Sequence, residues 1–162
     1  GYDTRRGSTE YCVIVNNTLY NNARLSDAWG AELYVQYDTR YNIIKNNIFY
    51  AGSGKPYILS WSTVMTGNEV DYNLFYNGAS WQWKNVTYNT FSAYQSGTGN
   101  DVHSLNGVDP LLVNAASGNL RLQSASPAIN AGQNLDLSGP YDIDGNPRIQ
   151  GGIIDIGAHE AR

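Results

Sequence analysis

The sequence predicts an all-β fold made of stacked repeats, that is, a solenoid of short parallel strands. The first observation behind this prediction is an Asn-rich segment that recurs along the first half of the chain. The second is a composition of 19 Asn, 17 Gly and 13 Tyr among 162 residues. Asn and Gly favour tight turns and Tyr favours strands, so this composition is typical of a chain with many turns and little helix.

The repeat is visible when residues 15–22, 45–52 and 71–78 are aligned on Asn17, Asn47 and Asn73, which are 30 and 26 residues apart. Such a period indicates stacked structural units. In a stack, equivalent side chains lie above one another, so the three Asn are predicted to form a hydrogen-bonded ladder. The equivalent aromatic residues are predicted to stack likewise: Tyr20, Tyr50 and Tyr76. An antiparallel sandwich also contains short strands, but it does not require the same side chains at a fixed step.

The remaining pattern divides a single domain, residues 1–162, into three parts. Alternating segments predict strands at 32–36, within 41–48 and at 57–61, so residues 1–80 are interpreted as repeat coils. Residues 81–125 are predicted to hold the last coils and a long loop, with strands at 80–84, 111–113 and 119–122 and a short helix at 90–95 capped by Thr90 or Ser92. Residues 126–162 are rich in Pro, Gly and Asp, and we expect them to cap the last coil.

Composition also excludes some classes of partner. The net charge is −4 and no basic cluster is present, which argues against nucleic acid as a partner. No run of 18 apolar residues occurs, so no membrane span is predicted. The single cysteine, Cys12, lies in a strand-like segment and is interpreted as a buried structural thiol.

Several sequence motifs in the second half of the chain resemble those of a known family. Gly107-Val108-Asp109-Pro110-Leu111, Ser126-Pro127-Ala128-Ile129-Asn130 and Asp142-Ile143-Asp144-Gly145-Asn146-Pro147-Arg148, followed by Asp155-Ile156-Gly157-Ala158, stand after the Asn-rich repeats. Together they resemble bacterial secreted proteins of the pectate-lyase-like superfamily, which are right-handed parallel β-helices. The resemblance implies that fold, truncated here at the N-terminus, and an extracellular or cell-surface location.

The resemblance does not imply one activity, because the superfamily includes lyases, hydrolases, epimerases and adhesins. We therefore expect a carbohydrate-associated β-helix segment, with polysaccharide as the partner and no complete active site. The alternatives are a non-catalytic structural or adhesive surface solenoid, or a gene fragment with no function of its own. An open N-terminal coil around residues 12–15 also predicts a homodimer through that end.

If the chain is an enzyme, the expected reaction is that of a polysaccharide lyase or a glycoside hydrolase. A lyase needs a base, for which Arg40 and Lys55 are candidates with Asp38 and Asp71 as partners. A hydrolase needs two carboxylates, and the best candidates for them are Glu32, Glu69 and Asp71. Glu69 and Asp71 are two residues apart, so they share one face of a strand. The alternative for each of these residues is a solvated charge at a turn or on a polar strand face.

Other residues are candidates for binding. Trp61, Trp81 and Trp83, together with Trp29, are candidate sugar-stacking platforms, although Trp81 and Trp83 would equally pack under the 85–105 loop. His103 is interpreted as a structural histidine that holds its loop, and His159 as part of the cap surface. Asp142 and Asp144 resemble the start of a Ca²⁺ loop, although the same residues form a turn that Arg148 would close. No cofactor is required.

Overall fold

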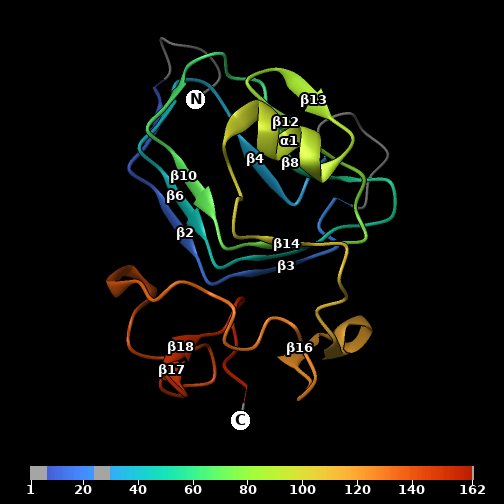
Figure 1. Cartoon of the computed structure of the whole chain (residues 1–162), viewed down its shortest axis with the longest axis vertical. Coiled ribbons are helices and arrows are strands. Elements are labelled where there is room, and N and C mark those ends of the chain that lie inside the picture. Colours follow the sequence, from blue (N-terminus) through green and yellow to red (C-terminus); the bar gives the residue numbers. More distant parts are fainter. Residues whose placement is uncertain (1–6, 24–29, 162) are drawn as a thin grey trace.

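The computed structural model describes residues 7–23 and 30–161 (Figure 1). The described part is mostly β, with strands β1–β18 and one α-helix, α1.

The chain passes three times through the same series of strands, and we call each passage a rung. The first rung holds β1 (Thr9–Glu10), β2 (Val13–Val15), β3 (Thr18–Tyr20) and β4 (Leu33–Val35); the second holds β5 (Thr39–Arg40), β6 (Ile43–Lys45), β7 (Ile48–Tyr50) and β8 (Pro56–Ser60); the third holds β9 (Met65–Thr66), β10 (Glu69–Asp71), β11 (Leu74–Tyr76) and β12 (Ser80–Trp83).

Each strand pairs in parallel with the equivalent strand of the next rung. The resulting sheets have the orders β1-β5-β9, β2-β6-β10, β3-β7-β11-β14 and β4-β8-β12-β13, of which only the β12-β13 pair is antiparallel. Within the described residues no sheet closes on itself. These stacked parallel sheets are consistent with a β-helix-like fold.

The register of the stack is the one that the aligned repeats predict. Leu19 lies opposite Phe49, and Phe49 lies opposite Phe75. The Oδ1 atom of Asn47 accepts hydrogen bonds from the backbone N and Nδ2 of Asn17, both at 3.0 Å, and Asn73 Oδ1 accepts from the same two atoms of Asn47 at 3.0 and 3.1 Å. The rungs are therefore joined by side chains as well as by strand pairing.

The outward tyrosines of these strands also contact one another. The rings of Tyr20 and Tyr50 are 4.9 Å apart, and those of Tyr50 and Tyr76 are 5.0 Å apart, in both cases edge to face. The sequence pattern alone did not reveal a second ladder one corner earlier. There Asn68 Oδ1 accepts from Asn42, whose own Oδ1 accepts from the Cys12 backbone N.

The interior of the stack is apolar because every second side chain of these strands points inward. Phe49 and Phe75 are fully buried and stack with their ring centroids 5.1 Å apart. Ile44, Val70 and Ile58 are buried around them.

The end of the stack beyond the third rung is covered by the middle of the chain. Strands β12 and β13 (Val86–Tyr88) form a hairpin, and α1 (Phe91–Thr98) packs on it with the buried Tyr94 stacked on Trp81 at 5.4 Å. As predicted, a helix begins here and Thr90 caps it, accepting from Ala93 N at 3.3 Å. The short strand β14 (Leu105–Asn106) then adds to β11 as a fourth, partial rung.

The C-terminal part does not lie where we predicted. It contains the antiparallel pairs β15 (Leu112–Asn114) with β16 (Asn119–Leu122) and β17 (Ile149–Gln150) with β18 (Ile153–Ile154), and the 3-10 turns at Ala115–Ser117 and Asp136–Ser138. Instead of capping the last coil, it packs beside the stack, below the β3-β7-β11-β14 sheet in Figure 1. The physical reason is that the outer face of this sheet carries Ile48 and Leu74, which are buried against Leu112, Ala128 and Ile156.

At the opposite end of the stack, β1, β2, β3 and β4 each have a strand partner on one side only among the described residues. Cys12 is exposed at this edge, so the prediction of a buried thiol is wrong. Its segment lies on the outermost rung of the described residues. The homodimer through this end stays a prediction. No helix in the described part is long and apolar enough to cross a membrane.

The outer face of the β2-β6-β10 sheet as the candidate site

The candidate site is the outer face of the β2-β6-β10 sheet. In β10 the side chain of Val70 points into the core with 4% exposure, so Glu69 and Asp71 point outward, as the two-residue spacing predicts. The register places Lys45 of β6 opposite Asp71. Lys45 and Asp71 occupy the same position of the aligned repeat, so the repeat contained a signal for Lys45 that we did not use.

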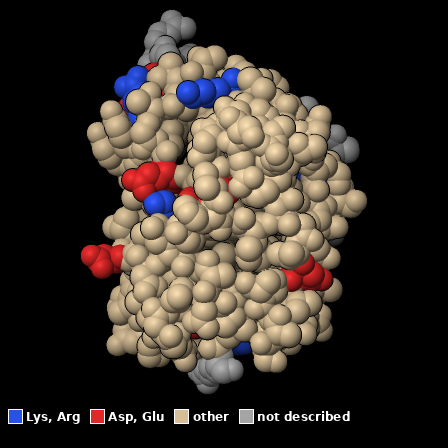
Figure 2. Space-filling model, in the orientation of Figure 1, with Lys and Arg blue, Asp and Glu red and all other residues tan. Residues whose placement is uncertain are grey.

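Lys45 forms the centre of the polar contacts on this face. Its Nζ atom donates to Glu69 Oε2 at 2.6 Å and to Gln133 Oε1 of the C-terminal part at 3.1 Å. The Lys45 side chain is 12% exposed and that of Glu69 is 60% exposed. Glu69 therefore presents its carboxylate to solvent from a position held by the ion pair. Figure 2 shows acidic and basic side chains meeting at the left margin, over this sheet, on a face with few other charges.

Asp71 is held by the loop that follows α1. Its Oδ2 atom lies 2.7 Å from His103 Nδ1, and its Oδ1 atom accepts from the His103 backbone N at 2.8 Å. The His103 ring also stacks on Tyr72 with a centroid distance of 4.9 Å. His103 thus has the contacts expected of a histidine that holds its loop, and it also brings an exposed imidazole to the rim of the face.

A pair of exposed tyrosines lies at the corner that precedes β2 and β6. Tyr11 and Tyr41 are 70% and 47% exposed, and their rings stack 5.3 Å apart with an angle of 15° between them. The third rung has Gly67 at this corner, where a Cβ atom would lie 2.5 Å from the Tyr41 ring. The glycine therefore lets the Tyr41 ring lie across the corner toward β10. Tyr11 and Tyr41 are 30 residues apart, the same step that separates Asn17 from Asn47, so the repeat contained a signal for this pair that we did not use.

The other proposed catalytic residues lie elsewhere. Glu32 is buried before β4 and accepts from the backbone N of Asn22, and its pKa is raised because burial disfavours the charged form. Arg40, on β5, forms ion pairs with Glu10 at 3.6 Å and Asp38 at 3.7 Å. Lys55 lies in the turn between β7 and β8. These residues belong to other corners and sheets, so they do not extend the Glu69–Asp71 face.

The tryptophans are mostly in the core. Trp81 and Trp83 are 3% and 5% exposed, packed in the cluster that includes Tyr94 and Phe91. Their burial corrects the interpretation of both as surface platforms, since a buried ring face is not available to a surface sugar. Trp61 is 39% exposed, and Trp29 lies outside the described residues.

The Asp142–Asn146 turn is closed by its own hydrogen bonds. Ligand atoms of Asp142, Asp144 and His159 lie within 4.8 Å of one another. Asp142 is mostly buried, which by itself raises its pKa, but donation from the backbone of Glu160 and Asn146 outweighs this and holds the pKa at about 2. Arg121 donates to both oxygens of Asp144 at 2.8 and 2.6 Å. These donors occupy much of the two carboxylates, and a Ca²⁺ site at this turn stays a prediction.

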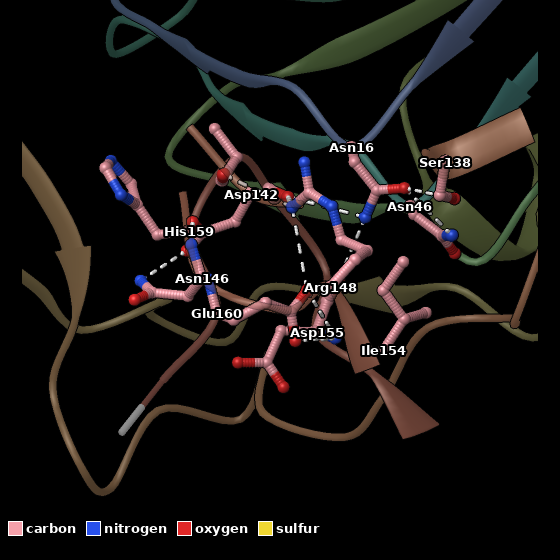
Figure 3. A network of polar contacts seen from close by, with 12 residues as sticks. Asn16, Asn46, Ser138, Asp142, Asn146, Arg148, Ile154, Asp155, His159 and Glu160 are labelled. Carbon is pink, nitrogen blue, oxygen red and sulfur yellow. Dashed lines mark hydrogen bonds and ion pairs between the residues drawn. The ribbon is translucent and has the colours of Figure 1, made fainter. Parts of the chain in front are cut away.

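Arg148 does not close that turn, contrary to our prediction. It is buried between the C-terminal part and the stack (Figure 3), where its Nη1 lies 3.5 Å from Glu160 Oε1 and donates to the carbonyl of Ala158 at 3.2 Å. Beside it, Asn16 Nδ2 donates to the Asp155 carbonyl, and Asn46 Nδ2 donates to the Gln133 carbonyl. These contacts join the C-terminal part to the corners of the first two rungs.

The buried carboxyls of this protein predict an unusual dependence of stability on pH. Burial, with the nearby Asp155, raises the pKa of Glu160 to about 7, and burial raises that of Asp101 to about 6. The folded protein therefore keeps protons that the unfolded chain releases near pH 4 to 4.5. The free energy of unfolding should fall between about pH 4.5 and 7, by roughly 1 kcal/mol per pH unit for each group within its window.

This pH dependence is measured by urea unfolding at half-unit steps from pH 4.5 to 8. Glu160→Gln should flatten the upper part of the slope, and Glu69→Gln, on the exposed face, serves as the control that leaves it unchanged. A flat profile for the unsubstituted protein would contradict the assignment of raised pKa values.

The fold and site define a predominantly β protein of stacked parallel sheets with a polar face of paired charges beside an exposed aromatic pair. Comparison with known proteins finds a similarity to the uncharacterized protein YwoF of Bacillus subtilis (strain 168), at 36% identity over 132 residues. The match covers 79% of this chain and 28% of that protein, so the chain spans about a quarter of its relative's length. No family model and no solved structure matches.

Proposed function

We propose that the chain is a segment of a right-handed parallel β-helix of the pectate-lyase-like superfamily, extracellular or on the cell surface, that binds polysaccharide. Support for the fold comes from the four parallel strand series and from the Asn ladder through Asn17, Asn47 and Asn73. Support for the family comes from the C-terminal sequence motifs, from Gly107-Val108-Asp109-Pro110-Leu111 to Asp155-Ile156-Gly157-Ala158. The polysaccharide lies along the outer face of the β2-β6-β10 sheet.

The observation that carries the proposal is that polar pairs and an exposed aromatic pair meet on one open face. Lys45 with Glu69, and Asp71 with His103, offer charged donors and acceptors for sugar hydroxyls. The Tyr11–Tyr41 pair at the corner offers ring faces for the C–H groups of a pyranose. A chain of sugars lying along the sheet would reach both.

The geometry favours binding over cleavage. A hydrolase needs one carboxyl as an acid and one as a base or nucleophile. Here Glu69 is engaged by Lys45 and Asp71 by His103, so each carboxylate already has a cationic or hydrogen-bonding partner. The alternative function, a structural or adhesive solenoid, is favoured by the same pairing, because paired charges also keep a strand face soluble.

We expect polysaccharide binding to weaken about tenfold in Glu69→Gln and in Tyr41→Ala, which corresponds to about 1.4 kcal/mol for each variant. The reasons are the loss of an acceptor held by Lys45 and the loss of the stacked ring. The measurement is affinity electrophoresis and calorimetry with uronate-containing and neutral polysaccharides, with and without Ca²⁺. Matched controls are Lys84→Met and Tyr141→Ala, exposed residues away from this face.

The same samples are assayed for unsaturated products by ultraviolet absorbance and for reducing ends. Binding without products supports the proposal, whereas cleavage that disappears in Glu69→Gln would make the chain a lyase or hydrolase. A folded protein that binds none of the polymers would favour the structural solenoid. Equal losses in the site and control variants would also reject this face as the binding surface.

A further inference from the structure

The last, partial rung leaves a gap in the interior of the stack. In register, Leu19, Phe49 and Phe75 form the inward-facing row of the first three rungs. The fourth strand, β14, contributes Asn106 opposite Phe75, so the aromatic row ends there in an exposed carboxamide. The helix α1 covers only the other side of this end, where Phe91 packs on Phe75 and Trp81.

The gap is a pocket of about 400 Å³ between the β14 strand and the start of α1. Aromatic residues and carboxamides form most of its lining: Tyr57, Tyr76, Trp81, Phe91, Asn89 and Asn106. Among the described residues no Asp, Glu, Lys, Arg or His lines it. Its volume lies in the lower part of the range of about 300–1,000 Å³ that is usual for small-molecule sites.

One buried donor at this pocket has no partner. The side-chain Nε1 of Trp81 is buried, and no acceptor lies within hydrogen-bonding distance of it among the described residues. A buried N–H without an acceptor costs about 1–3 kcal/mol, so it is rare in native proteins unless a ligand or water supplies the acceptor. Trp81 lines the pocket, but its Nε1 atom has almost no accessible surface, so a bound molecule reaches this atom only when the indole ring or a neighbouring side chain shifts.

The rim of the pocket carries further polar groups. Asn89 and Asn106 have no side-chain hydrogen bond within the described part, and each offers both donors and an acceptor. The Tyr57 hydroxyl accepts from the Gly78 backbone N at 2.8 Å. A side chain at Gly78 would collide with the Tyr57 ring, at 2.7 Å, so glycine is needed for the wall of the pocket to approach this closely.

We propose that this pocket binds a single neutral sugar ring. Aromatic faces match the C–H groups of a pyranose, and amides match its hydroxyls. The described lining has no cation, so it offers the carboxylate of a uronate or a phosphate group no charged partner. The site is separate from the sheet face proposed above, since its residues come from the β11–β14 end of the stack and from α1.

The test is a titration of the ¹⁵N-labelled full chain with methyl glycosides of glucose, galactose, mannose, xylose and N-acetylglucosamine, and with galacturonate. A neutral glycoside is expected to shift the Trp81 indole N–H and the Asn89 and Asn106 side-chain amides saturably, with a Kd in the millimolar range. Galacturonate is expected to produce at least about tenfold weaker binding. No saturable shift of these signals with any neutral glycoside, in a folded sample, would overturn the proposal.

Two substitutions of Asn106 test whether the sugar binds in this pocket. Asn106→Phe continues the Phe49–Phe75 row into the gap, so it should abolish binding while Tm stays equal or rises. Asn106→Ala should weaken binding about fivefold or more. Tyr141→Ala, an exposed residue of the C-terminal part outside both proposed sites, serves as the control and should bind glycosides unchanged. Unaltered binding in Asn106→Phe would place the sugar elsewhere and reject this site.

Discussion

Asn47→Ala is expected to lower the free energy of unfolding by roughly 3 kcal/mol. Asn47 is fully buried in the middle rung. Its Oδ1 atom accepts from Asn17, and its Nδ2 atom donates to the Ile14 carbonyl at 2.8 Å and to Asn73 Oδ1. Alanine removes these contacts, so the Asn17 backbone N and the Ile14 carbonyl of the first rung lose the side chain that joins them to the second rung.

The matched control is Asn17→Ala, at the exposed edge of the same ladder. Its side chain donates to Asn47 Oδ1 and to the Val15 carbonyl, but solvent reaches both groups once it is removed. We expect a loss of about 1 kcal/mol or less. Urea unfolding followed by circular dichroism measures both variants. Losses of similar size would show that the ladder contributes little beyond the strand pairing.

Arg148→Met is expected to destabilise the protein by about 2–3 kcal/mol, because it removes the cationic partner of Glu160 and the donor to two carbonyls. The cost of the unpaired carboxyl is limited, because Glu160 has a pKa of about 7 and takes up a proton. The side chains of Arg148 and Glu160 are 9% and 0% exposed. Arg148 also donates to the Gly157 and Ala158 carbonyls. The segment around Gly157 contacts the stack, since Gly157 N donates to the Asn46 carbonyl at 2.8 Å. Losing Arg148 should therefore loosen the C-terminal part from the first two rungs.

Limited proteolysis and thermal unfolding measure this effect. Cleavage within residues 107–161 should become faster in Arg148→Met while the intrinsic fluorescence of the four tryptophans, none of which lies in that part, stays unchanged at low temperature. Arg121→Met is the control, since Arg121 pairs with Asp144 at the surface with a side chain 55% exposed and should cost no more than about 1 kcal/mol. Equal protease resistance of the two variants would contradict this role for Arg148.

Much of the stack follows from local pattern. The register of β3, β7 and β11 was predictable because Asn, an inward apolar residue and Tyr recur at the same spacing in each rung. The shared outward direction of Glu69 and Asp71 followed from the two-residue period of a strand. The α1 helix followed from its cap, Thr90.

The other contacts on the candidate face form only when the rungs stack on one another. Lys45 reaches Glu69 from the neighbouring strand, and Gln133 reaches Lys45 from 88 residues away. Tyr11 and Tyr41 are brought into contact by rungs 30 residues apart. The repeat step places Lys45 beside the Glu69 strand and Tyr41 beside Tyr11. The contact of Lys45 with Gln133 comes from a distant segment outside the repeat, and no local pattern contains that information.

By itself, the sequence determined which side chains of each rung point inward and how the rungs align, because strand alternation and the Asn spacing are local properties. Only the tertiary structure decided that residues 107–161 lie beside the stack rather than over its end. Alternation shows that Ile48 and Leu74 point away from the core of the rungs, but not what they meet there. Burying these residues against Leu112, Ala128 and Ile156 removes apolar surface from water, and that gain depends on distant segments meeting.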